Sequence, residues 1–160
     1  MSRRSEVSAG ILAFRRKGDG KLELLLAHPG GPYWRNRDQG AWSIPKGQVE
    51  SGDLVACAKR EFNEETGLTA DGPLLALTPA RQKSGKLVHA FALEADFDLA
   101  GFASNDFEME WPPRSGKRQR FPEIDRIAYF DLATARRKIL PGQRAFIEEL
   151  VAHLRKKTPS

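Results

Sequence analysis

Cysteine is nearly absent from this chain, since Cys57 is the only one among 160 residues. A single thiol cannot form an internal disulfide, so the sequence excludes a fold built on a disulfide framework. Long apolar runs are missing as well. The longest ones, such as residues 11–14 and 24–27, fall far short of the ~18 residues that a membrane helix needs. We therefore expect a cytoplasmic protein that has no membrane partner.

The chain also lacks the usual signatures of several ligand-binding classes. Its 26 Lys and Arg residues against 21 Asp and Glu residues leave a net charge of +5, too small to distinguish nucleic acid, a membrane surface or a phosphorylated substrate as the partner. The three histidines show no mutual spacing typical of a zinc site. Gly85-Lys86 lacks the upstream glycine and the following Ser or Thr of a phosphate-binding loop. The order of strands and helices given below, without a regular alternation, also disfavours a doubly wound nucleotide fold.

The composition is that of an ordinary globular protein. Hydrophobic residues make up 40% of the chain, and the length fits one compact domain, residues 1–160. We expect residues 157–160 to form a frayed basic tail. Oligomeric state cannot be read from the sequence.

Turn formers and apolar periodicity divide the chain into strands and helices. Two apolar runs, residues 7–14 and 22–27, flank Gly18, Asp19 and Gly20 and predict an opening hairpin. Asp53 and Gly67 are the expected cap and stop of a helix over residues 54–66. The other predicted elements are an extended segment at 41–49, strands at 74–79, 87–97 and 127–130, a long polar loop at 100–122 and a closing helix at 143–156. This order predicts an α/β (α+β) fold in which helices pack on a mixed sheet.

Three carboxylates share one face of the predicted first helix. Glu61, Glu64 and Glu65 stand at i, i+3 and i+4 near its C-terminal end, where the helix dipole and their mutual repulsion both disfavour negative charge. A divalent cation would compensate these charges, and oxygen ligands suit Mg²⁺ or Mn²⁺. The alternative is a solvated acidic face eased by an Arg60–Glu64 ion pair, which the carboxylates alone favour.

The surrounding sequence reverses that preference. The run Arg60-Glu61-Phe62-Asn63-Glu64-Glu65-Thr66-Gly67-Leu68 matches in register the second half of the box that defines one family of hydrolases. Five fixed residues recur by chance at roughly 10⁻⁴ in a chain of this length. The segment resembles the Nudix box, and Trp-x-x-Pro-Lys-Gly at residues 42–47 is similar to the branch that cleaves dinucleoside polyphosphates. The resemblance implies a Nudix-like α/β/α sandwich with a mixed central sheet.

The first half of the box departs from the family pattern. Gly47 is followed after five residues by Asp53 instead of Glu, and six residues instead of seven separate Asp53 from Arg60. The missing residue lies upstream of the three glutamates, so it leaves their mutual geometry intact. It shortens the connection to Gly47 by up to ~3.5 Å, which we expect the Ser51-Gly52 pair to absorb.

The resemblance implies roles for individual residues. Glu61, Glu64, Glu65 and the Gly47 carbonyl are the expected ligands of Mg²⁺ or Mn²⁺, and Glu110, or its neighbour Glu108, is a candidate further ligand. Glu61 and Glu64 are expected to be catalytic, with one box glutamate as general base, and Arg60 is expected to orient a carboxylate. In this family the base also occurs on a loop elsewhere.

Substrate contacts are expected from basic and aromatic residues. Lys46 beside the box and Arg118 in the long polar segment are candidates to hold phosphates, and Tyr33 and Trp34 are candidates to stack on a base. A solvated basic loop and ordinary aromatic packing are the alternatives. Arg114, Lys117 and Arg120 belong to the same basic cluster, and Trp111 is a third aromatic candidate.

The implied function is hydrolysis of a pyrophosphate linkage in a nucleoside diphosphate linked to another group, with dinucleoside polyphosphates preferred. A second hypothesis is removal of pyrophosphate from the 5′ end of RNA, with the basic cluster following the phosphates. A third is a catalytically impaired module that only binds a nucleotide. The sequence does not identify the group that is linked to the nucleoside diphosphate in the substrate.

Overall fold

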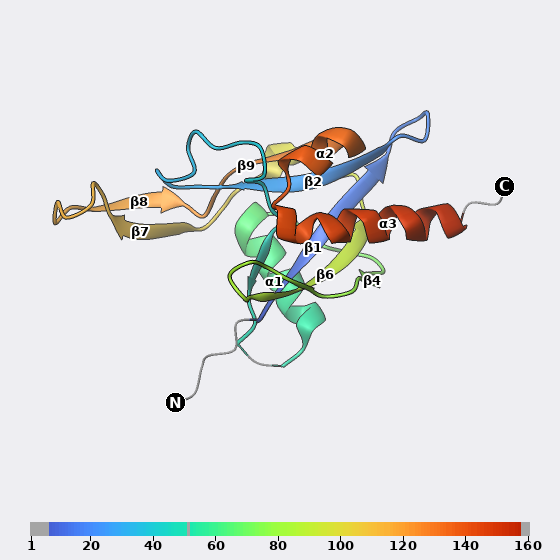
Figure 1. The fold of residues 1–160 in the computed structure, drawn as a ribbon, viewed down its shortest axis with the longest axis horizontal. Coiled ribbons are helices and arrows are strands. Elements are labelled where there is room, and N and C mark those ends of the chain that lie inside the picture. The colour runs from blue at the N-terminus through green and yellow to red at the C-terminus, as the bar shows by residue number, and fades with distance from the viewer. Residues whose placement is uncertain (1–6, 51, 158–160) are drawn as a thin grey trace.

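A computed structural model describes residues 7–50 and 52–157, and these residues form a mixed sheet covered by helices (Figure 1). The strands are β1 (Val7–Arg16), β2 (Leu22–Pro29), β3 (Lys46–Gln48), β4 (Leu75–Ala76), β5 (Ala80–Arg81), β6 (Leu87–Glu94), β7 (Asp106–Glu110), β8 (Arg118–Pro122) and β9 (Ile124–Asp131). The helices are α1 (Leu54–Thr66), α2 (Leu132–Lys138) and α3 (Arg144–Lys157), with 3₁₀ turns at Leu99–Gly101 and Pro141–Gln143. None of these helices is long and apolar enough to cross a membrane.

The main sheet runs in the order β4-β6-β1-β2-β9, with β3 paired to β1 and β5 paired to β6. The predicted opening hairpin is confirmed, since β1 and β2 are antiparallel neighbours. β1 is also parallel to β6, which makes the sheet mixed. Because β1 lies at the centre, its residues are buried almost without interruption, as expected of a strand covered on both faces.

Each face of the sheet has its own hydrophobic core. Phe62, Cys57 and Ala58 of α1 pack on one face, and α3 packs Phe146 and Leu150 on the other. Cys57 is 2% exposed in the first of these cores. The arrangement confirms the predicted α/β/α sandwich.

The predicted ends of α1 are confirmed in detail. The Asp53 carboxylate accepts hydrogen bonds from the backbone N–H groups of Val55 and Ala56 at the first turn. Gly67 ends the helix with φ = 76°, a left-handed conformation in which its N–H reaches the Asn63 carbonyl. The closing helix also forms and extends through Lys157, the first residue of the expected tail. Residues 158–160 lie outside the described residues, as does Ser51.

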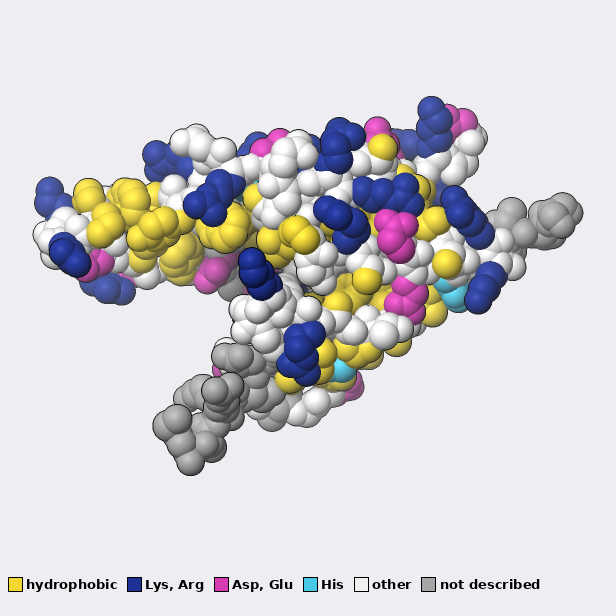
Figure 2. Space-filling view, in the orientation of Figure 1, with side chains coloured by type: hydrophobic (Ala, Val, Ile, Leu, Met, Phe, Trp, Pro, Cys, Tyr) yellow, Lys and Arg dark blue, Asp and Glu magenta, His cyan; other side chains and the backbone are white. Residues whose placement is uncertain are grey.

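Residues 100–122 form a hairpin and not the long loop that their composition predicts. β7 and β8 pair as a separate two-stranded sheet that projects from the main body (Figure 1). The two half-buried residues Phe107 and Met109 alternate with exposed acids along β7, so a period-two pattern is present within the polar stretch. Figure 2 shows hydrophobic side chains along this hairpin and Lys and Arg side chains over α2 and α3.

The sequence analysis also missed α2, a helix of seven residues that follows directly on β9. Asp131 caps it by accepting a hydrogen bond from the Thr134 N–H. The segment is too short to show a helical hydrophobic period.

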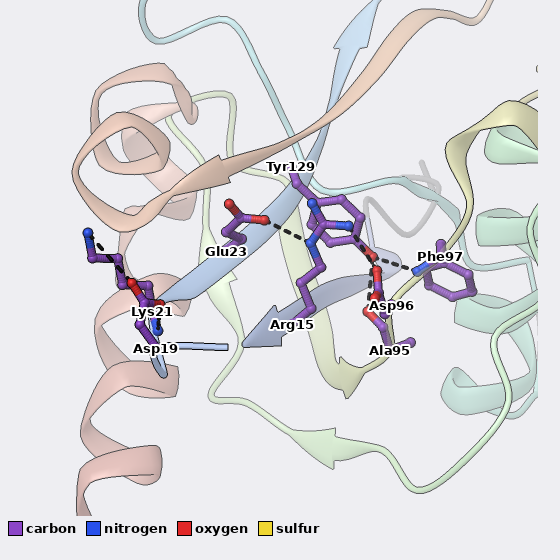
Figure 3. Close-up of polar contacts among 8 residues, drawn as sticks. All are labelled: Arg15, Asp19, Lys21, Glu23, Ala95, Asp96, Phe97 and Tyr129. Atoms are coloured by element: carbon purple, nitrogen blue, oxygen red, sulfur yellow. Dashed lines mark hydrogen bonds and ion pairs between the residues drawn. The ribbon is translucent and has the colours of Figure 1, made fainter. Parts of the chain in front are cut away.

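A network of polar contacts ties β1 to β9 and to the chain that follows β6 (Figure 3). The Arg15 guanidinium lies 3.7 Å from the centre of the Tyr129 ring and donates hydrogen bonds of 2.8 Å to both Glu23 and Asp96. It is 20% exposed. Through this stacking contact and these two hydrogen bonds, Arg15 of β1 contacts β2 and β9 at one end of the sheet.

The Tyr129 hydroxyl completes this network. It donates a hydrogen bond to the Ala95 carbonyl at 2.9 Å and accepts one from the Phe97 N–H at 3.0 Å (Figure 3). Burial raises the pKa of Tyr129. The Phe97 ring in turn packs 5.4 Å from the Phe62 ring of α1. The network thus fixes the chain against which the acidic helix rests.

Candidate active site

The three box glutamates project from the last turns of α1 and are partly buried. Burial, and then the charge of Glu64, raises the pKa of Glu61. Burial raises the pKa of Glu65 to about 8, although the backbone N–H of Lys46 partly stabilises its charge. Two of the three carboxylates are therefore held where burial, more than repulsion, makes negative charge costly.

Gly47 is docked directly against the first of these carboxylates. A Cβ atom on residue 47 would lie 1.8 Å from Glu61 Oε1, so only glycine fits. The position is fixed by sheet pairing, because Gly47 lies opposite Ala9 in the β1–β3 ladder. The shorter link to α1 is therefore compatible with close contact between Gly47 and the helix.

The Lys46 N–H donates a hydrogen bond of 3.2 Å to Glu65 Oε1 and joins β3 to α1 a second time. Arg60, which is 51% exposed, forms an ion pair of 3.5 Å with the less exposed Glu61. Within residues 7–50 and 52–157, no three His, Cys, Asp or Glu side chains are arranged as a metal-binding group.

A cavity of about 240 Å³ opens beside Glu65, and we call it the Glu65 cavity. Lys46, Trp34 and Glu123 contribute to its wall, together with apolar residues that include Ile44 and Leu140. Burial, followed by the charge of Lys86, lowers the pKa of Lys46. The cavity therefore combines one basic, two acidic and several apolar side chains next to the box.

The sequence analysis missed Glu123. Its carbonyl accepts a hydrogen bond from Gly30 and its N–H donates one to the Asn105 carbonyl, so it is held between the ends of β2 and the projecting hairpin. Burial raises the pKa of its carboxyl group, and its charge contributes to the raised pKa of Glu65. Glu123 has no motif spacing relative to the box and lies outside the predicted strand at 127–130, so no signal in the sequence identified it.

Gln143 is a second residue that the sequence analysis did not identify. Its fully buried side chain accepts a hydrogen bond of 3.0 Å from the Ile44 N–H and donates to Ser43 and to Gln82 at the same distance. These bonds fix the chain that leads into Lys46 and Gly47. A residue of the 3₁₀ turn before α3 thus positions the loop that carries the box glycine.

The predicted site residues divide into two groups in space. Lys46, Glu65 and Trp34 line the Glu65 cavity, and Gly47 lies against Glu61 next to Lys46. Glu64 is on the same helix, close enough for its charge to raise the pKa of Glu61. Tyr33 is 57% exposed and packs edge-on against Trp111 at 5.1 Å. Of the predicted substrate contacts, the structure therefore brings Lys46 and Trp34, but not Tyr33, to the wall of this cavity.

Glu110 and Arg118 lie at the outer end of the β7–β8 hairpin, where they pair across the ladder. The hairpin begins near the site, since the Asn105 N–H bonds to the Glu64 carbonyl. Five residues of extended chain place Glu110 roughly 16 Å further along. There its carboxylate accepts a hydrogen bond from the Gly116 N–H. The structure does not bring Glu110 to the box, and Glu123 occupies the position next to Glu65 instead.

The basic cluster of the hairpin is partly neutralised within the hairpin itself. Arg118 lies 3.2 Å and Arg120 lies 3.6 Å from the carboxylate oxygens of Glu108. Arg118 is 64% exposed on this charged face. Because Arg118 lies at the outer end of the hairpin, it is not among the residues that line the Glu65 cavity, whereas Lys46 is.

Comparison with known proteins gives a family match and several similar folds. The model of the NUDIX domain family matches residues 4–150, whereas no curated protein matches significantly. An Ap4A hydrolase from C. elegans has a TM-score of 0.62 and 23% identity, covering 93% of this chain and 98% of that chain. The NUDIX domain of Shewanella oneidensis NrtR, solved with ADP ribose, has a TM-score of 0.64 and 15% identity, covering 96% and 90%. A mutT/nudix family protein from Listeria innocua has a TM-score of 0.65 and 18% identity, covering 97% and 98%.

The structural likeness confirms the fold, and the family match extends over nearly the whole chain. The box carboxylates, the docked glycine and the adjoining cavity occupy one region of that fold. The chain therefore belongs to the Nudix family of pyrophosphohydrolases.

Proposed function

We propose that this protein uses Mg²⁺ or Mn²⁺ to hydrolyse a pyrophosphate linkage in a nucleoside diphosphate linked to another group, with dinucleoside polyphosphates preferred. One observation carries the proposal. Gly47 is in contact with Glu61, its neighbour Lys46 is bonded to Glu65, and Lys46, Glu65 and Glu123 line one cavity. The proposal is supported by this gathering of carboxylate oxygens, one lysine and a further acid, Glu123, in one region.

The residues present fit a divalent cation. Glu61, Glu64 and the Gly47 carbonyl would hold it, with Glu65 beside them, and such oxygen donors are what Mg²⁺ and Mn²⁺ prefer. The absence of a side chain at residue 47 leaves the Glu61 carboxylate room against the backbone of β3. A bound ion would neutralise phosphate charge and lower the pKa of a bound water.

The other residues of the cavity have separate tasks in this proposal. Lys46 holds a phosphate oxygen of the substrate, and Trp34 provides a surface for a base. Glu123 accepts the proton of the attacking water, because burial raises the pKa of its carboxyl group and a stronger base results. Arg60 orients the Glu61 carboxylate from the surface.

The preference for dinucleoside polyphosphates rests on two supports. The run of residues 42–47 resembles the branch that cleaves these compounds, and the similar C. elegans structure is described as an Ap4A hydrolase. The phosphates of such a substrate would lie along Lys46, with one nucleoside in the Glu65 cavity. A triphosphorylated RNA is the substrate against which this preference should be measured.

The experiment is a panel of substrates assayed with Mg²⁺, with Mn²⁺ and with a chelator. The panel contains diadenosine polyphosphates, ADP-ribose, nucleoside triphosphates and triphosphorylated RNA. We expect metal-dependent release of a nucleotide, fastest with diadenosine polyphosphates. Glu64→Gln should lower turnover by roughly 10²-fold or more, whereas Glu94→Gln should not, because Glu94 is an exposed partner of Arg16 at 3.4 Å.

Three outcomes would contradict parts of the proposal. Faster turnover of triphosphorylated RNA than of diadenosine polyphosphates would contradict the proposed substrate preference. Equal rates of hydrolysis with metal and with chelator would contradict the proposed metal dependence. Absence of hydrolysis, with nucleotide binding that Glu64→Gln leaves unchanged, would make the domain a binding module.

A further inference from the structure

A second cavity, larger than the first, lies on the other side of the chain segment that leads into the box. Its volume is about 440 Å³, and we call it the Arg126 cavity. Trp42 lines it, whereas its two neighbours in the sequence, Ala41 and Ser43, line the Glu65 cavity. Successive side chains of an extended segment point to opposite sides. Residues 41–43 therefore form a wall that separates the two cavities.

The Arg126 cavity is rich in positive charge. Arg35, Arg37, Arg126 and Lys138 contribute four cations, and Asp38 is the acid in the same lining. Cations in a concave, partly apolar site are recognition elements for anions, above all for phosphate groups.

The acidic groups that face these cations leave a positive excess. Lys138 donates a hydrogen bond to Asp38 at 2.5 Å, and Arg126 lies 3.6 Å from Asp125. Two carboxylates thus stand against four cations. The hydrogen bond from Lys138, followed by that from Trp42, lowers the pKa of Asp38, and the charge of Arg126 lowers it further.

Buried groups hold the walls of this cavity in place. His28 is fully buried, with one ring nitrogen 2.6 Å from the Arg37 carbonyl and the other 2.8 Å from the Asp125 carboxylate. It therefore links the loop that carries Arg37 to the strand that carries Arg126. Trp42 packs edge-on against the His28 ring at 5.1 Å. Binding of an anion would require little reordering of this backbone.

The floor of the cavity is apolar. The half-buried Phe130 and Ala128 line the cavity together with Trp42, which is 3% exposed. The Arg126 guanidinium is 5.2 Å from the centre of the Trp42 ring, and the Lys138 ammonium is 5.4 Å from that of Phe130. A ligand that presents a phosphate to the cations and an apolar part to the floor would match both surfaces.

We propose that the Arg126 cavity is a second binding site, distinct from the Glu65 cavity, which takes the phosphate group of an organic phosphate of about the size of a mononucleotide. The proposal does not depend on hydrolysis. The anion would interact with Arg35, Arg37 and Arg126, with Lys138 shared between the ligand and Asp38. Because residues 41–43 border both cavities, the occupied site would adjoin the loop that carries Lys46.

The test measures binding to the metal-free protein, residues 1–160, in the presence of chelator. The probes are inorganic phosphate, AMP and adenosine, each added at millimolar concentrations. The readout is the indole N–H resonance of Trp42, whose proton is hydrogen-bonded to Asp38 at 2.8 Å. We expect phosphate and AMP to shift this resonance, AMP to bind more tightly than phosphate, and adenosine to have little effect.

Matched variants identify the cations that act. Arg35→Gln combined with Arg126→Gln should weaken AMP binding by about tenfold or more, because charge-assisted contacts are lost. Arg126→Lys retains a charge and should have a smaller effect. Arg155→Gln, an exposed arginine of α3, is the control and should bind AMP like the unaltered protein.

Some results would overturn the proposal. These are an unshifted Trp42 resonance at saturating AMP, or equal AMP affinity in the double variant and in Arg155→Gln. Tight binding of adenosine would also contradict it, because recognition would then not involve phosphate. The hydrolytic assay of the Glu64→Gln variant is independent of all these measurements, so failure of one proposal leaves the other intact.

Discussion

Replacing Glu65 by Gln is expected to change how the stability of the metal-free protein depends on pH. Burial raises the pKa of Glu65 from 4.5 to about 8 in the folded state. Between these values the folded state retains a proton that the unfolded state has released. The free energy of unfolding therefore falls as the pH rises through this interval, and the contribution of protonated Glu65 is complete only below about pH 4.5.

The size of the effect follows from the two pKa values. Each pH unit between them corresponds to about 1.4 kcal/mol, so ionisation of Glu65 costs the folded state up to roughly 5 kcal/mol by pH 8. Gln cannot ionise, yet its amide oxygen still accepts the hydrogen bond from the Lys46 N–H. Glu65→Gln should therefore be more stable than the unaltered protein at pH 8 and should differ little near pH 4.5.

The assay is urea unfolding in the presence of chelator over the range from about pH 4.5 to about pH 8. The control is Glu94→Gln, whose exposed carboxylate should leave the pH dependence unchanged. Addition of Mg²⁺ should stabilise the unaltered protein more than Glu65→Gln, because a cation offsets the charge of the ionised group. Parallel stability curves for the Glu65→Gln and unaltered proteins would refute the reasoning.

Two further substitutions test how the loop is positioned. Gly47→Ala places a Cβ atom 1.8 Å from Glu61 Oε1 and should lower kcat by about 10²-fold, whereas Gly18→Ala, with no heavy atom within 4 Å, should not; equal rates in steady-state kinetics would contradict this. Gln143→Leu removes the acceptor of the buried Ile44 N–H and should cost about 1–3 kcal/mol in denaturant unfolding. A variant as stable as the unaltered protein would show that the bond is dispensable.

The parts of the fold that could be predicted are those with local signals. Asp53 and Gly67 mark both ends of α1, because a cap and a left-handed stop are properties of single residues. The register of Glu61, Glu64 and Glu65 places all three on one face of that helix. The β1–β2 hairpin was likewise predicted, since both strands are apolar and the turn between them is short.

The parts that could not be predicted depend on contacts between distant segments. Glu123 reaches the site through backbone bonds to Gly30 and Asn105, and neither bond leaves a period in the sequence. Gln143 acts on Ile44 across 99 positions of the chain. The acids and bases of the β7–β8 hairpin obscured its alternating apolar residues, so Glu110 was expected near the box and not at the hairpin's outer end.

The single thiol of the chain provides a natural reporter of movement in the acidic helix. Cys57 lies in the core between α1 and the sheet, and burial raises the pKa of its thiol, so little of the reactive thiolate is present in the folded state. A thiol-specific reagent can reach it only when α1 separates locally from β1. The labelling rate of the unaltered protein thus measures how often the helix opens, and a ligand that holds α1 in place should slow that rate.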